Sequence, residues 1–525
     1  MPPLFAIFAW PVIGAVLFQK LRLPLAILVT LIGGFLLLPE RGGIDFPVLP
    51  PLNKYTAPAL TALLMAALLV PPRSSEARLA GAWSRLTLAR MLLLGLIASA
   101  FLSVVTNSDT LIYGGRVLAG LSLYDGFSIV LNTLMMVLPM FLARKYLATP
   151  EAHRMVLLTL CVAGLAYSFL ALIEIRLSPQ LNQWIYGFFP HSFAQHVRGG
   201  GYRPLVFLSH GLVLAIFFSG TIFAAIGLAR LDARRRTLFL LAAFWLLAVL
   251  ILSRSLGALV ITLALLPVAL FLTIRMQMIF AVIVASIFLT YPVLRGSGFV
   301  PLERITSAAA SINADRASSL QTRFDNEEMI LGKAEQRPIF GWGSWGRWRV
   351  YDSETGADIT ISDGYWIIII GSGGWARYLF EFGLLTLPIF LLFLRSGQLK
   401  VGRETSTLAL ILAGNLIDLI PNASVTPITW ILAGALWGRL EVGATERAVE
   451  ASIPAAVDEP VRAYVRSAPP EIVSRPTAAH ARKTTQAHTR DKEETRAASS
   501  SLYTRQTTRI TRTPPPGRPS RRKPT

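Results

Sequence analysis

Apolar stretches long enough to cross a lipid bilayer follow one another along most of the chain. A membrane-spanning helix needs about 20 mostly apolar residues, and fewer where neighbouring helices cover it. The predicted fold is therefore an all-α polytopic membrane protein with about 12–14 transmembrane helices. The thirteen candidate spans are residues 4–19, 23–39, 56–71, 87–105, 127–143, 154–174, 205–228, 237–253, 256–274, 277–293, 377–395, 406–420 and 424–439.

The loops between these spans differ in charge, and the difference predicts their side of the membrane. Short cytoplasmic loops are rich in Lys and Arg. One set of alternate loops, at residues 20–22, 73–90, 144–154, 230–236, 275 and 395–403, carries most of these residues. The short loops of the other set hold only Arg41, Lys54, Arg116 and Arg254, with three more Arg in the longer loop 175–204. Placing the first set in the cytoplasm puts the long internal loop 294–376 outside, in the periplasm of a Gram-negative cell.

Composition agrees with the pattern of spans. Of the 525 residues 53% are hydrophobic and 15% charged, whereas soluble proteins carry roughly 25% charged residues. The single cysteine, Cys161, lies in an apolar run and is expected to be a buried, inert thiol, which excludes a disulfide framework and a thiolate metal site. No basic residue precedes the first apolar run, so it is expected to be an uncleaved span.

Residues 441–525 differ from the rest of the chain. They contain 16 Lys and Arg against 9 Asp and Glu, among many Pro, Ala, Thr and Ser residues. This composition predicts a disordered cytoplasmic tail, which either touches anionic lipid headgroups or is simply solvated. The predicted organisation is thus N-terminal helices over residues 1–199, a membrane core over 200–440 that includes the loop 294–376, and the tail. No GxxxxGK[ST] phosphate loop is present.

Ionisable residues at membrane depth are costly and therefore mark candidate functional positions. Arg254 lies in a short outer loop within "LSRSLGAL", and Arg203 and His210 open a span in "GGGYRPLVFLSHGL". Read as helix, the spacing of Arg203 and His210 puts both on similar faces. Glu381 and Asp418 lie in the last spans, where pairing with a neighbouring Arg is the expected structural role.

Arginines at one membrane face suit the binding of a lipid-linked diphosphate. The guanidinium group donates two parallel hydrogen bonds to phosphate, and the diphosphate of such a lipid lies at the interface. Arg254 could instead extend to lipid phosphates. His210 could equally be a histidine that packs between helices.

The long outer loop has recognisable parts. Residues 316–334 are predicted to be helical, Pro338 ends that helix, and Gly341 and Gly343 form a turn. A second helix is predicted through residues 363–370.

At this point the sequence resembles the bacterial O-antigen ligase and O-antigen polymerase superfamily of polytopic, metal-independent glycosyltransferases. The resemblance covers roughly residues 200–395. It rests on four pieces in order: "YRPLVFLSHG", "LSRSLGAL", Arg323 with "RPIFGWGSW", and "SDGYW" before "GGWARYLFEFGLL".

The resemblance implies transfer of a glycan from undecaprenyl pyrophosphate to an acceptor sugar hydroxyl in surface or exopolysaccharide assembly at the bacterial inner membrane. The expected partners are the lipid-linked glycan donor, the sugar acceptor and membrane lipids, with no nucleic acid, no metal and no cofactor. Cations must neutralise the leaving diphosphate, a base must accept the hydroxyl proton, and aromatic rings can pack on sugars. The residues assigned to catalysis are Arg254, Arg323 and Asp363; those assigned to substrate binding are Arg203, His210, Arg337, Trp342, Trp345 and Trp366.

The chain departs from the family at one motif. O-antigen ligases carry a His-Asn pair where this chain has Ser362-Asp363, and residues 294–376 contain no His. Asp363 is therefore the first candidate for a base in this loop, followed by Asp352 and Asp358. Asp363 could also be an N-cap of the following helix. The departure favours a polymerase-like or exopolysaccharide-processing member, or a homologue without activity.

Two other classes of protein fit parts of the pattern. A transporter of lipid-linked glycans should show discontinuous helices in two matching halves, and the sequence shows one unusual loop without a duplicate. A non-catalytic scaffold could bind glycan through the Trp residues of the loop, although Trp is also common at membrane interfaces. Catalysis predicts that Arg203, Arg254, Arg323 and an acid converge on one cavity.

Overall fold

The computed structural model describes residues 2–47, 49–69, 87–198, 200–312 and 314–452. Over these residues the protein is almost entirely helical. The helices belong to one compact unit, Met1–Ala456. The last helix, α18 (Pro427–Ser452), continues past residue 441, where the predicted tail begins. The rest of that tail lies outside the described residues, and the predicted division near residue 199 stays a prediction.

Each of the thirteen predicted spans overlaps one helix. Seven of these helices are long and apolar enough to cross a membrane, and α2, α3, α10 and α11 are shorter apolar helices. The prediction of an all-α polytopic membrane protein is therefore confirmed. Besides α18, the helices that match the predicted spans are α1 (Pro3–Lys20), α2 (Leu23–Leu37), α3 (Thr56–Leu69), α5 (Thr87–Val105), α6 (Leu123–Tyr146), α7 (Pro150–Leu177), α9 (Gly211–Leu231), α10 (Arg236–Leu252), α11 (Leu256–Phe271), α12 (Ile274–Gly296), α15 (Tyr365–Leu394) and α17 (Arg403–Asp418).

Local sequence sets several of these helix starts. Thr149 caps α7 by accepting a hydrogen bond from Ala152 N, and Pro150 occupies the first helical position, where no intrahelical N–H bond is lost. Ser122 and Asp125 form a capping box at the start of α6. Thr273 caps α12 in the same way as Thr149. These caps allow long apolar helices to follow one another through short connections.

The helix α9 lies at the centre of the bundle. It packs against α7, α10, α11 and α17, and nearly all of its side chains are buried. The core continues into α18, where Trp430 and Trp437 are fully buried. A second buried contact joins α6 to α18 through the Arg144–Glu441 ion pair. Burial of α9 on all sides fixes the position of its N-terminus, which lies at Gly211.

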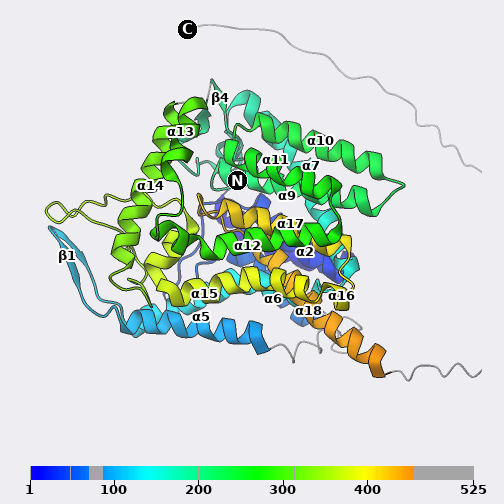
Figure 1. The fold of residues 1–525 in the computed structure, drawn as a ribbon, viewed down its shortest axis with the longest axis horizontal. Coiled ribbons are helices and arrows are strands. Elements are labelled where there is room, and N and C mark those ends of the chain that lie inside the picture. The colour runs from blue at the N-terminus through cyan, green and yellow to red at the C-terminus, as the bar shows by residue number, and fades with distance from the viewer. Residues whose placement is uncertain (1, 48, 70–86, 199, 313, 453–525) are drawn as a thin grey trace, which may run out of the picture. The chain divides into compact units, whose positions relative to one another are not determined.

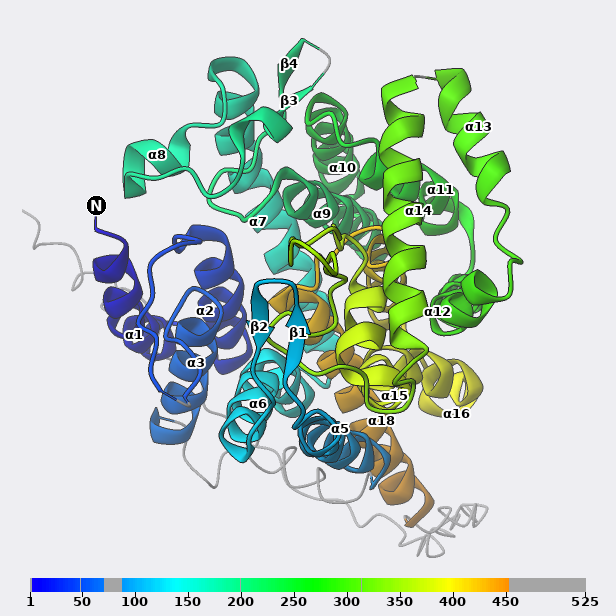
Figure 2. The ribbon, with the colours of Figure 1, turned by 90° about the vertical axis from the view of Figure 1, so that its left-hand side faces the viewer.

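Smaller elements gather at one end of the long helices. In Figure 1, α13 (Leu302–Ile312), α14 (Ala314–Ala334) and β1 (Leu111–Tyr113) lie at one end of the bundle, and α16 (Ser396–Leu399) lies at the other. Figure 2 looks onto the first end. Two antiparallel hairpins lie there, one pairing β1 with β2 (Arg116–Leu118) and the other β3 (Val197–Arg198) with β4 (Gly201–Tyr202). We call this end the loop end.

The α16 end holds basic residues that the charge pattern assigned to the cytoplasm. Arg230, at the end of α9, donates hydrogen bonds to the carbonyl oxygens of Ala269 and Leu272 at the end of α11. Arg403, at the start of α17, donates to the carbonyl oxygen of Arg230. The helix ends predicted to share the cytoplasmic side thus lie together. The side of the membrane that each end faces stays a prediction.

Candidate active site

Arg203 and Arg254 lie side by side at the loop end. An Nη2 hydrogen of Arg203 is donated to the carbonyl oxygen of Arg254 at 3.3 Å. The Arg254 side chain in turn donates to the carbonyl oxygen of Arg198 in the β3–β4 hairpin at 2.7 Å. Arg254 has a positive φ of 56°, which non-glycine residues adopt rarely, at the position after the C-cap of α10, where left-handed backbone is common. The two arginines predicted to bind diphosphate therefore form one cationic pair.

His210 joins this pair by a route that the sequence did not predict. The span predicted from residue 205 begins instead at Gly211, and His210 is the N-cap of α9, with Nδ1 accepting from Leu212 N at 3.0 Å. The helical-turn argument for Arg203 and His210 is therefore wrong, because residues 203–210 are not helical. The side chain of Arg203 nevertheless lies against Gly211, next to His210.

Two further histidines contact His210. Its ring centroid lies 4.8 Å from that of His191 and 4.9 Å from that of His196. His196 Nδ1 lies 3.0 Å from the carbonyl oxygen of Ser192, so this nitrogen carries the proton and donates it. Burial, with smaller contributions from His191 and Arg203, lowers the pKa of His196 to about 4. The His196 ring is therefore neutral at pH 7 and acts as a hydrogen-bonding group close to the arginine pair.

Arg323 and Asp363 form a second pair at the loop end. Arg323 Nε lies 2.9 Å from Asp363 Oδ2, and Nη1 donates to the carbonyl oxygen of Pro421 at 3.3 Å. Arg323 comes from α14, Asp363 precedes α15, and Pro421 lies between α17 and α18. Three segments far apart in sequence thus meet at one ion pair. Both side chains remain partly exposed, so a substrate can reach them.

Asp363 is not the cap of α15. The helix begins at Tyr365 rather than 363, and its N-cap is Gly364, which makes no side-chain capping bond. The N–H of Tyr365 is donated instead to the carbonyl oxygens of Leu419 and Asn422. The Asp363 carboxylate therefore has the ion pair with Arg323 as its described interaction, and no capping role competes with a catalytic one.

Asp418 and Glu381 have different partners. Asp418 accepts hydrogen bonds from Asn422 and Ser424, so the expected pairing with an Arg is wrong for this residue. Glu381 is fully buried and forms an ion pair with Arg377 at 2.9 Å, as expected. Tyr365 donates a hydrogen bond to the same carboxylate.

The stretch "RPIFGWG" closes a break in α15. The helix is interrupted at Gly374, which has φ 63° and ψ −167°. Residues 338–343, which we call the bridging segment, supply backbone partners to both sides of this break. The four bonds run from Trp342 N to Gly371 O, Gly343 N to Ser372 O, Trp375 N to Pro338 O and Ala376 N to Ile339 O, at 2.8–3.0 Å.

Close backbone approach explains two glycines of this region. A Cβ atom on Gly341 would lie 2.6 Å from the backbone nitrogens of Gly373 and Gly374. A Cβ atom on Gly374 would lie 2.4 Å from the carbonyl oxygen of Ile339. The groups freed by the break are therefore satisfied by protein backbone, as is required of irregular structure at membrane depth.

Arg337 and two of the tryptophans assigned to substrate binding have packing positions. Arg337 Nη2 lies 2.8 Å from Asp109 Oδ2, and Arg337 Cζ lies 4.2 Å from the ring centroid of Trp342. These contacts join the bridging segment to the end of α5. Trp342 is buried and donates to the carbonyl oxygen of Lys333. Trp366 is fully buried and packs edge-on against Tyr291.

Trp345 differs from these two tryptophans. Its ring is exposed, and its Nε1 donates to Asp125 at 3.0 Å. Of the three tryptophans assigned to substrate binding, Trp345 presents its ring to solvent in this conformation. The assignments of all three, and that of Arg337, stay predictions.

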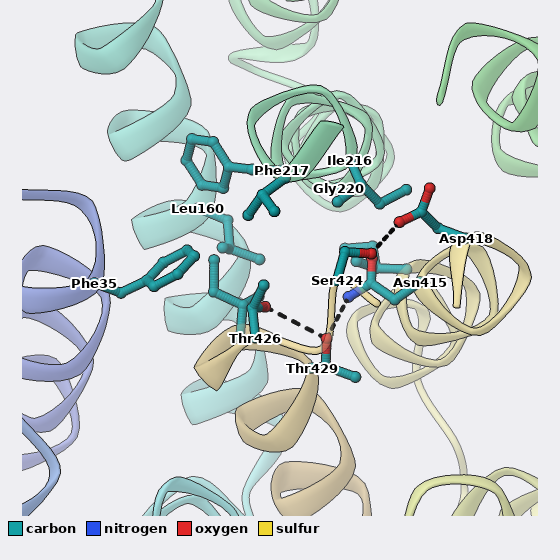
Figure 3. A pocket seen from close by; sticks show the side chains of 13 residues that line it. Phe35, Leu160, Ile216, Phe217, Gly220, Asn415, Asp418, Ser424, Thr426 and Thr429 are labelled. Carbon is teal, nitrogen blue, oxygen red and sulfur yellow. Dashed lines mark hydrogen bonds between the residues drawn. The ribbon is translucent and has the colours of Figure 1, made fainter. Parts of the chain in front are cut away.

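A pocket lies among α7, α9, α17 and the segment that precedes α18 (Figure 3). Its wall includes Val213, one turn after His210 in α9, and Asp418 and Ser424, close to the partners of Arg323. Its volume of about 20 Å³ leaves room for roughly one water molecule. In this conformation it therefore does not hold a sugar.

Sequence reasoning missed several charged residues that build the site. Glu174 lies in the last turn of α7, Lys54 precedes α3, Arg377 follows the break inside α15, and Asp109 follows α5. Glu174 and Arg377 occupy the last and first positions of their predicted spans. A search for charges at span ends, in addition to span interiors, would have found both.

Glu327 gives the loop end a predicted pH dependence. Burial is the largest cause that raises the pKa of this α14 carboxyl to about 7, although Arg295 acts in the opposite direction. Because the folded protein then binds a proton more tightly than the unfolded chain, stability should fall by about 2 kcal/mol as pH rises from 5 to 8. Glu327→Gln should reduce this slope because glutamine does not titrate. Arg295 keeps Glu328 as a partner in this variant. Thermal unfolding followed by Trp fluorescence at several pH values checks this, and an unchanged slope would contradict it.

Helix content and composition define the protein as a multi-pass membrane protein. Among the loops at one end of its helices lie the Arg203–Arg254 contact and the Arg323–Asp363 ion pair. Residues 241–391 match the O-antigen ligase family, so the chain carries a domain of that family. The matched region runs from α10 to α15 and includes Arg254, Arg323, the bridging segment and Asp363. A comparison with curated proteins gave no match.

Proposed function

We propose that the protein is an inner-membrane glycosyltransferase that transfers or polymerises a glycan from an undecaprenyl-pyrophosphate carrier onto an acceptor sugar hydroxyl. The observation that carries the proposal is the arrangement of the Arg203–Arg254 and Arg323–Asp363 pairs at the loop end of a chain with an O-antigen ligase family domain. The lipid tail of such a donor fits a site at the ends of membrane helices, where its diphosphate would meet these arginines.

The proposed reaction divides the chemistry between the two pairs. The acceptor hydroxyl oxygen attacks the anomeric carbon of the donor glycan, and the bond from that carbon to the diphosphate oxygen breaks. Arg203 and Arg254 neutralise the charge that develops on the leaving diphosphate. Asp363, oriented by Arg323, takes the hydroxyl proton. The products are the extended glycan and undecaprenyl pyrophosphate.

Removing either group should slow glycan transfer strongly. Loss of one charge-stabilising donor, or of a general base, costs about 10²-fold in rate or more. We therefore expect Arg254→Ala and Asp363→Asn each to reduce kcat for transfer by about 10²-fold. The assay follows a radiolabelled lipid-linked glycan with purified full-length protein in lipid nanodiscs.

Two variants in the same loop are matched controls. Arg349 pairs with Asp358, and Asp352 closes its own turn by accepting from Thr355. Arg349→Ala and Asp352→Asn remove the same charges at side chains engaged in these contacts and should transfer at the wild-type rate. A loss in Asp352→Asn would move the base from Asp363 to Asp352. If Arg254→Ala and Asp363→Asn also transfer at that rate, the site assignment is wrong.

A further inference from the structure

The carboxylate of Glu174 is buried in the last turn of α7 and is surrounded by backbone N–H groups. Oε2 accepts from Leu205 N at 2.8 Å and from Val206 N at 2.7 Å. Oε1 accepts from Leu181 N at 3.0 Å. Glu174 has 1% of its surface exposed. Charge-assisted bonds of this kind are about twice as strong as neutral ones, so this carboxylate is a firm anchor for the segments that donate to it.

The segment held by Glu174, residues 203–210, is both buried and irregular. Leu205, Val206 and Leu208 are fully buried, and Val206 has a φ of 55°, which is rare for a β-branched residue. Backbone N–H and C=O groups in such a place need partners, because each unsatisfied buried group is costly. The segment has no helical hydrogen bonds with which to satisfy them all. Side chains from other elements must therefore fix its shape.

Two more side chains complete this support. Lys54 Nζ donates to the carbonyl oxygen of Phe207 at 2.6 Å and pairs with Glu40 at 3.0 Å. Tyr167, two turns before Glu174 in α7, accepts from Phe207 N at 3.1 Å. The supports come from α7 and from the loop between α2 and α3, outside the region that matches the family.

The irregular segment connects Arg203, which the proposed function places at the diphosphate, with His210, which is assigned to substrate binding. Arg203 stands at its start and His210 at its end, where it caps α9. The positions of both side chains depend on the course of the backbone between them. Glu174 bonds the middle of that course, so its carboxylate sets the separation of the arginine pair from the N-terminus of α9.

We propose that Glu174 is a positioning residue for diphosphate binding and glycan transfer: by bonding Leu205 N and Val206 N, it holds Arg203 and His210 in the arrangement that the reaction requires. The proposal rests on the proposed function. It gives the N-terminal helices a task in the site, since α7 shapes a segment that presents groups to the donor.

Hydrogen exchange tests the positioning itself, without any activity. In Glu174→Gln an NH₂ group replaces one of the two acceptor oxygens. It cannot accept from the backbone N–H groups that it faces, so hydrogen bonds to them are lost. Amides of residues 203–210 should then exchange about tenfold faster, because exchange follows local opening. Ser168→Ala is the matched control, since Ser168 lies in α7 and accepts from Trp245 in α10. Unchanged exchange of residues 203–210 in Glu174→Gln, or equal acceleration in both variants, would overturn the proposal.

A double-mutant cycle tests the link to function. If Glu174 acts through Arg203, Glu174→Gln should lower kcat/KM for transfer by about tenfold in the wild type and change little in an Arg203→Ala background. A purely structural role of Glu174 gives equal losses of kcat/KM in both backgrounds, and this result would contradict the link to Arg203. If the wild type neither transfers glycan nor binds inorganic pyrophosphate, the proposed function fails, and the exchange experiment still decides whether Glu174 holds the segment.

Discussion

Gly374→Ala is expected to destabilise the protein by about 4 kcal/mol, a large share of the roughly 5–15 kcal/mol by which folded proteins are typically stable. The native φ of 63° and ψ of −167° belong to a region that essentially only glycine adopts. The new methyl group would also lie 2.4 Å from the carbonyl oxygen of Ile339 and 2.5 Å from that of Pro338. Both contacts are to backbone, which cannot move without breaking the bonds that close α15.

Thermal unfolding in nanodiscs and the yield of monodisperse protein measure this effect. Gly332→Ala is the matched control. Gly332 lies inside α14 with no atom within 4 Å of the added methyl group, so this change should be neutral or slightly stabilising, by about 0.5–1 kcal/mol. Wild-type stability in Gly374→Ala would show that the break in α15 is not rigid.

The fold could be predicted from hydrophobic runs because lipid imposes one solution on the backbone. Each apolar run of sufficient length must satisfy its N–H and C=O groups internally, and the helix does so. The run at 205–210 is an exception with a physical reason: side chains of Glu174, Lys54 and Tyr167 satisfy its backbone from outside. Hydropathy does not contain the information that such partners exist.

The break in α15 could not be predicted from the sequence either, because the partners that satisfy its backbone also come from another part of the chain. The bridging segment reads as a turn rich in Gly and Trp, and its hydrogen bonds to residues 371–376 cannot be seen in its own sequence. The glycines of "RPIFGWG" were correctly read as sites of unusual backbone. Their cause is the close passage of a second backbone segment.

The candidate site was predicted residue by residue and not as an arrangement. Charge at membrane depth singled out Arg203 and Arg254, and the family resemblance added Arg323 and Asp363. The pairing of Arg323 with Asp363 depends on Pro421 and its neighbours, which lie about a hundred residues away. Aromatic character alone also could not predict that the ring of Trp366 is buried and that of Trp345 is exposed.

Arg377→Met is expected to lower the free energy of unfolding by about 3–5 kcal/mol, because it leaves the Glu381 carboxylate buried without its cation. Glu381 has no exposed surface, and its described polar partners are Arg377 and Tyr365. The double variant Arg377→Met with Glu381→Gln should recover most of this loss, since glutamine is neutral and its oxygen still accepts from Tyr365. Recovery in the double variant identifies the isolated charge as the cause. Equal losses in the single and double variants would instead show that Arg377 stabilises α15 through its own packing beside the break.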